Sequence, residues 1–192
     1  MTEIADLAQL AAHRPNRADA RRNFDALIAA ARLSFAELGT EAPLEEIARR
    51  AGVGIGTLYR NFPTREALIE SVYVEQVLAV VEAAKVVADL PPWEALMAWL
   101  TQFLDYVGTK RALVTALNRD SQTLKACRSA LYPAGEPLLK RAQDAGLVRA
   151  DVGMDDVMRM LSGVAAVNFA DAAQRDKVIG MALDGLRTRG AA

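Results

Sequence analysis

The fold is decided by the stretch LEEIARRAGVGIGTLYRNFPTR, residues 44–65. Two short segments with helical apolar spacing, residues 44–50 and 55–61, flank the turn Ala51-Gly52-Val53. This order predicts a helix-turn-helix. Gly52 suits the positive-φ position of such a turn, because glycine reaches that conformation without the steric cost other residues meet.

The second helix of this motif is predicted to carry a polar outer face. Leu58 and Phe62 continue the apolar stripe toward a preceding helix. A short helix that presents hydroxyl, guanidinium and amide groups outward is suited to the major groove of DNA. The candidate DNA-reading residues on this face are Ile55, Gly56, Thr57, Tyr59, Arg60 and Asn61.

The rest of the chain also shows helical periodicity, and no strand-like alternation extends over four or more residues. We predict an all-α fold of about nine helices. The expected division is a flexible N-terminal arm (residues 1–16), a helix-turn-helix DNA-binding domain (17–64) and a larger helical body for ligand sensing and dimerisation (65–192). Gly108 is predicted to end one helix of the body, and Pro133-Ala134-Gly135 to interrupt another.

Composition excludes several classes of protein. The 192 residues contain one Cys and one His, which argues against a disulfide framework and against a Cys- or His-based metal site. No uncharged stretch is long enough to span a bilayer, and the N-terminus lacks the basic start of a secretory signal. We therefore expect a soluble cytoplasmic protein without cofactor or metal. Residues 14–65 hold nine Arg, no Lys and six acids, a local charge of +3 that favours an anionic partner there.

The segment LIAAARLSFAELGTEAPLEEIARRAGVGIGTLYRNFPTREALIESVY, within residues 17–75, resembles the DNA-binding domain of the tetracycline-repressor (TetR) family. The resemblance implies that Thr57 and Tyr59 contact the DNA backbone or a base, and that Arg65 binds phosphate at a helix N-terminus. It assigns sequence preference to Ile55, Gly56, Arg60 and Asn61. The chain departs from the family pattern at Gly54-Ile55, where Ser-Lys or Ser-Arg is common, and at Pro43, which replaces a capping Thr. Ile55 is then free to contact a thymine methyl group.

The last two helices are candidates for a dimer interface. Apolar residues surround both of them almost completely, so each must be covered on more than one side. One side is expected to face the body and the other a second subunit, as in the four-helix interfaces of the family; burial within one subunit is the alternative. The candidate interface residues are Met158, Leu161, Ala165, Phe169, Val178, Met181 and Ala182.

The middle helices hold large apolar residues at helical spacing. Such residues belong to a core more often than to a pocket, but the resemblance implies an effector cavity in this region. Few charges fall on these faces, so we expect an apolar or modestly polar small molecule. The candidate pocket residues are Trp99, Phe103, Tyr106, Leu117, Cys127 and Leu131.

These observations predict a homodimeric, ligand-responsive transcriptional regulator. It is expected to repress by binding a near-palindromic double-stranded DNA operator and to be released by a small molecule. An enzyme is the first alternative, but no catalytic motif supports it and no catalytic residues are assigned. A helical adaptor that binds only protein is the second; salt dependence separates it from a DNA-binding protein.

Overall fold

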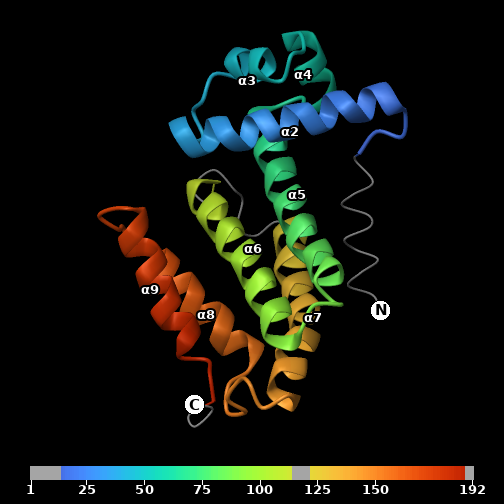
Figure 1. Ribbon diagram of the computed structural model, residues 1–192. Helices are drawn as coiled ribbons and strands as arrows, with labels where there is room; N and C mark the ends of the chain where they lie inside the picture. Colours follow the sequence, from blue (N-terminus) through green and yellow to red (C-terminus); the bar gives the residue numbers. More distant parts are fainter. Residues whose placement is uncertain (1–13, 114–121, 189–192) are drawn as a thin grey trace. The chain divides into compact units, whose positions relative to one another are not determined.

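The computed structural model describes residues 14–113 and 122–188 (Figure 1). Within these residues the chain forms eight helices and no strand longer than an isolated bridge. The helices are α2 (Ala18–Leu38), α3 (Leu44–Arg50), α4 (Ile55–Asn61), α5 (Arg65–Val86), α6 (Pro92–Leu113), α7 (Gln122–Asp144), α8 (Met154–Ala165) and α9 (Ala172–Asp184). The predicted all-α class is confirmed. No helix in the described ranges is long and apolar enough to cross a membrane.

The chain divides into two compact units. The first comprises Met1–Leu78 and Thr109–Arg128, and the second comprises Ala79–Gly108 and Ser129–Ala192. The divisions fall inside α5, α6 and α7, so each of these helices contributes to both units.

In the first unit, α2 supplies the platform on which the helix-turn-helix is built. Its apolar stripe is buried, including Leu27, Ala31 and Phe35. Gly39 ends the helix with φ +74°, and its N–H donates to the carbonyl of Phe35. Glycine adopts a positive φ readily, and here it ends α2 and turns the chain toward α3.

The second unit is organised around a buried tryptophan. Trp99 on α6 is fully buried, and its indole N–H donates to the backbone carbonyl of Val80 on α5 at 2.9 Å. Its ring lies directly over Gly135 of α7, where an added Cβ would stand 2.4 Å from the ring. The absence of a side chain at this position therefore allows α6 and α7 to pack closely within the unit.

Two predicted helix breaks are wrong. Helix α6 continues through Gly108 to Leu113, and α7 runs unbroken through Pro133 and Pro137. A proline inside a helix removes a backbone hydrogen bond and costs about 3 kcal/mol. On the two sides of the prolines in α7, Leu131, Leu138 and Leu139 are all buried, so tertiary packing favours the continuous helix.

Candidate nucleic-acid interface

The helix-turn-helix of the first unit consists of α3, the turn at residues 51–54, and α4. Gly52 has φ +69°, which confirms the conformation predicted for it. The N–H of Val53 donates to the carbonyl of Ala48 at 3.0 Å and closes the turn against the end of α3. Ile47 and Ala48 are buried, and α3 and α4 pack against each other.

Helix α4 is anchored by one side and exposed on the other. Leu58 is its single fully buried side chain, and Phe62, directly after the helix, packs against Phe24 of α2 with the rings tilted and their centroids 5.2 Å apart. These contacts fix which face of α4 is turned outward. Tyr59 is 46% exposed and Ile55 37% exposed, so the outer face carries two large apolar side chains one helical turn apart.

The polar groups of α4 are arranged around Thr57. The guanidinium of Arg60 donates from Nη2 to the hydroxyl oxygen of Thr57 at 2.8 Å. The amide of Asn61 donates from Nδ2 to the backbone carbonyl of Thr57, also at 2.8 Å. Arg60 is exposed, whereas Asn61 is half-buried and turned back along its own helix. Thr57 and Arg60 therefore form one polar unit beside the exposed Tyr59.

Arg65 lies apart from this face. Its side chain is half-buried, and Nη1 donates to the backbone carbonyls of Thr40 at 2.8 Å and Ala42 at 2.6 Å. The structure thus brings Ile55, Gly56, Thr57, Tyr59, Arg60 and Asn61 together on α4, and it places Arg65 against the loop that precedes α3. The sequence predicted a phosphate contact for Arg65 and did not predict this loop contact.

An ion-pair network on α3 was missed by sequence reasoning. Glu46 accepts from the guanidinium groups of Arg49 at 2.7 Å and Arg50 at 2.9 Å, and Arg50 also reaches Glu37 of α2 at 2.7 Å. The two arginines hold the pKa of the Glu46 carboxyl down at about 2. The spacing of the glutamate three and four residues before the arginines is a readable signal for such pairs.

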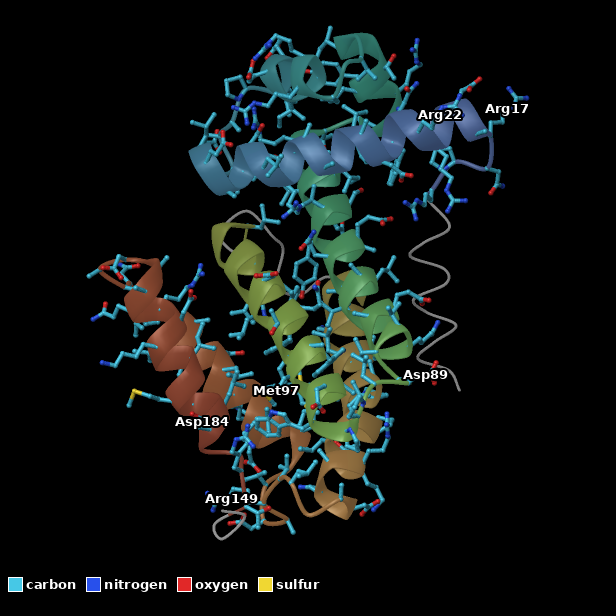
Figure 2. All side chains as sticks on the ribbon, viewed as in Figure 1. Arg17, Arg22, Asp89, Met97, Arg149 and Asp184 are labelled. Carbon is cyan, nitrogen blue, oxygen red and sulfur yellow. The ribbon has the colours of Figure 1, made fainter. Side chains whose placement is uncertain are left out.

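The arginines before and within the start of α2 differ in their surroundings. Arg14 bridges Asp25 of α2 at 2.5 Å and Glu75 of α5 at 4.0 Å, and so links the residues just before α2 to both helices within the first unit. Arg17 and Arg22 are exposed at the N-terminal end of α2, where Figure 2 labels them. Arg22 pairs with Asp19 of the same helix.

Only some of the candidate pocket residues lie in the same unit of the structure. Trp99, Phe103 and Tyr106 form a buried row along α6 in the second unit, with centroid separations of 6.1 Å and 5.8 Å. Leu131 is buried in the same unit, whereas Cys127 is buried in the first unit. Leu117 lies outside the described residues.

The candidate dimer residues differ in how far their side chains are buried. Helix α8 buries one face, formed by Met154, Val157, Met158 and Leu161, and no side chain of α9 is buried within the described chain. Met158 and Leu161 thus belong to the interior of a single chain, while Met181 is 67% exposed. The remaining candidates are half-buried: Ala165, Phe169, Val178 and Ala182. Helices α8 and α9 pack against each other, as Figure 1 shows.

Comparisons with known proteins match both parts of the chain. The model for bacterial regulatory proteins of the tetR family matches residues 27–72. A second model, described as transcriptional regulator SbtR-like, C-terminal domain, matches residues 91–188. None of the curated proteins matches the sequence at a significant level.

Solved structures give a consistent result. A TetR transcriptional regulator from Streptomyces coelicolor is 39% identical, covers 86% of this chain and 99% of its own, and gives a TM-score of 0.77. A TetR transcription regulatory protein from Mycobacterium vanbaalenii is 34% identical. The match covers 91% of this chain and 100% of that protein, with a TM-score of 0.73. The ketosteroid transcriptional regulator of Mycobacterium tuberculosis, 17% identical with coverage of 92% and 100%, shares the fold at a TM-score of 0.58.

Proposed function

The chain belongs to the TetR family of bacterial transcriptional regulators, and we propose that it is a homodimeric repressor of near-palindromic operator DNA. The observation that carries the proposal is the outer face of α4. Tyr59, Ile55 and Arg60 are exposed on a helix whose inner side is fixed by buried Leu58. Such a rigid short helix with apolar and cationic groups outward suits base edges and thymine methyl groups in a major groove.

The contacts proposed on α4 follow from its chemistry. Ile55 and Tyr59 are suited to thymine methyl groups and sugar edges, and Gly56 between them adds no side chain that would hold the backbone away from DNA. The Thr57–Arg60 unit offers donors for a guanine edge or a phosphate. Two copies of α4 in a dimer are expected to enter successive major grooves, since a single motif buries too little surface for specific binding.

The uncovered side of α8 and α9 is proposed as the contact with the second copy. Met181 is largely exposed, and Val178 and Ala182 beside it are only half-buried. Apolar side chains left uncovered along a helix are typical of a surface that is buried by association. We propose the division into a DNA-binding domain at residues 17–64, preceded by an arm at 1–16, and a body at 65–192.

A small, apolar or modestly polar effector is proposed to bind in the body and to release the protein from DNA in the cytoplasm. Release requires that the effector bind one of two states more tightly, commonly by about 1–3 kcal/mol. The aromatic row at Trp99, Phe103 and Tyr106 supports a largely apolar environment there. No catalytic role is proposed, because members of this family regulate transcription.

A mobility-shift assay with DNA from upstream of the chain's own gene tests DNA binding. We expect binding that weakens steeply as salt rises from about 50 to 200 mM, because phosphate contacts release counterions. Tyr59→Ala should lower the affinity about tenfold or more, whereas Leu33→Ala, a similarly exposed residue on α2, should not. Equal affinity of the Tyr59→Ala variant and the parent would refute the proposed contact, and salt-insensitive association with protein alone would favour an adaptor.

A further inference from the structure

The two helices of the helix-turn-helix begin without side-chain caps. Pro43 precedes α3 and Gly54 precedes α4, and neither provides a side-chain hydrogen bond to the first turn. Capping side chains normally hold the first backbone N–H groups of a helix and fix its start. The start of α3 must therefore be held in place by contacts from elsewhere in the chain.

Arg65 supplies such a contact. Its Nη1 atom lies 2.8 Å from the carbonyl of Thr40 and 2.6 Å from that of Ala42, in the loop immediately before Pro43. The loop otherwise has one internal bond, from the N–H of Ala42 to the carbonyl of Gly39 at 3.2 Å. Hydrogen bonds from a charged donor are stronger than neutral ones. Arg65 thus fixes the loop across 23 to 25 residues of sequence.

The same residue stands at the junction of α4 and α5. Only Phe62, Pro63 and Thr64 separate the end of α4 from Arg65. Phe62 is buried against Phe24, and the hydroxyl of Thr64 accepts from the N–H of Ala67 at 3.1 Å and caps α5. This short, fully engaged connection leaves little freedom between α4 and the first turn of α5.

We propose that Arg65 is a positioning residue that locks the loop before α3 to the first turn of α5. Helices α3, α4 and the start of α5 then move as one body. Its guanidinium is half-buried and donates from Nη1 to two carbonyls. In this role Arg65 sets the angle at which α4 is presented rather than binding phosphate. The consequence for operator recognition rests on the proposed function; the mechanical link does not.

The test uses the full chain with Arg65→Met, which removes the donors and keeps an apolar stem. Hydrogen exchange should become about tenfold faster or more in residues 40–51, because a local closing interaction is lost. Affinity for a duplex that the parent selects from a random pool should fall about tenfold. Affinity for a scrambled duplex, and the slope of log affinity against log salt, should stay unchanged, since no phosphate contact is removed.

Arg60→Met is the matched control, because it removes an exposed guanidinium that holds only Thr57 of its own helix. It should leave exchange in residues 40–51 unchanged. Arg65→Lys keeps the charge but shortens the side chain and removes the planar group; it should give intermediate exchange and intermediate specific affinity. If Arg65→Met does not fold, the hydrogen exchange of Arg65→Lys in residues 40–51 tests the proposal instead.

Unchanged exchange in residues 40–51 for both Arg65 variants would overturn the proposal. A salt slope that falls by about one in Arg65→Met, with normal exchange, would also overturn it and would identify a phosphate contact. If the parent chain selects no duplex at all, the proposed function fails. The exchange result then still decides whether Arg65 holds the loop.

Discussion

Helices α4 and α9 both leave most of their side chains uncovered, but the uncovered surfaces differ in chemistry. On α4, Thr57 and Arg60 form a polar unit beside Tyr59, all held outward by one buried leucine. On α9, no side chain is buried and Met181 is among the most exposed apolar residues of the described chain. Directed donors beside the exposed Tyr59 suit DNA, whereas the exposed side chain of Met181, beside half-buried Val178 and Ala182, suits a second copy of the chain.

The units that carry α4 and α9 should each have a closed interior. In the first unit this can be measured at Cys127, which is fully buried and whose pKa burial raises to about 12. Its thiol should remain protonated at neutral pH. We expect the native chain to react with a disulfide reagent about 1000-fold more slowly than a free thiol, from the thiolate fraction alone.

The unfolded chain in urea is the control for this measurement, and it should react at the rate of a free thiol. Because the folded pKa is raised, the stabilising contribution of the neutral thiol is lost as the pH rises above the unfolded value of about 9. Rapid reaction of the native chain at neutral pH would mean that the first unit opens readily.

In the second unit the packing of the interior can be tested by a substitution at Gly135. A Cβ at this position would stand 2.4 Å from the ring of Trp99 and 2.9 Å from the terminal methyl carbon of Met154. Trp99 cannot shift without losing its bond to Val80. Gly135→Ala should therefore lower the free energy of unfolding by about 3 kcal/mol, measured by denaturant titration at fixed protein concentration.

Gly108→Ala provides the matched control within α6, because nothing lies within 4 Å of a Cβ added there. It should leave stability unchanged or raise it by up to about 1 kcal/mol, since alanine favours the helix. If both alanine variants behave alike, the close packing of Trp99 on α7 is not a feature of the folded protein.

The apolar face of α9 can be tested with Met181→Asp. A charge placed in a proposed apolar contact should weaken association of two chains by about 2 kcal/mol, roughly a thirtyfold rise in the dimer dissociation constant. Sedimentation equilibrium measures this directly. Met181→Leu should associate as the parent does; an aspartate variant that also does so would place the contact between chains elsewhere.

Much of the DNA-binding region could be predicted because its determinants are local. The turn at Gly52 and the bounds of α4 follow from short patterns, and the structure has both of them. The all-α class follows in the same way from periodicity. Local patterns fail where distant packing decides the outcome, as at Gly108 and Pro133, which both lie inside continuous helices.

The partners of long side chains were the least predictable. Nothing near Arg65 in the sequence indicates the carbonyls of Thr40 and Ala42, because the loop reaches it only through the fold. The apolar pattern of α8 likewise does not show that Met158 and Leu161 turn inward while Met181 on α9 turns outward. The pairing of Glu46 with Arg49 was readable from spacing alone.

The central claim is that two copies of α4 read duplex DNA together. Hydroxyl-radical footprinting of the parent chain on a duplex that it selects tests this most directly. We predict two protected regions on one side of the duplex, centred about one helical turn, or 34–36 Å, apart. A single protected region, or protection that Tyr59→Ala leaves unchanged, would contradict the account.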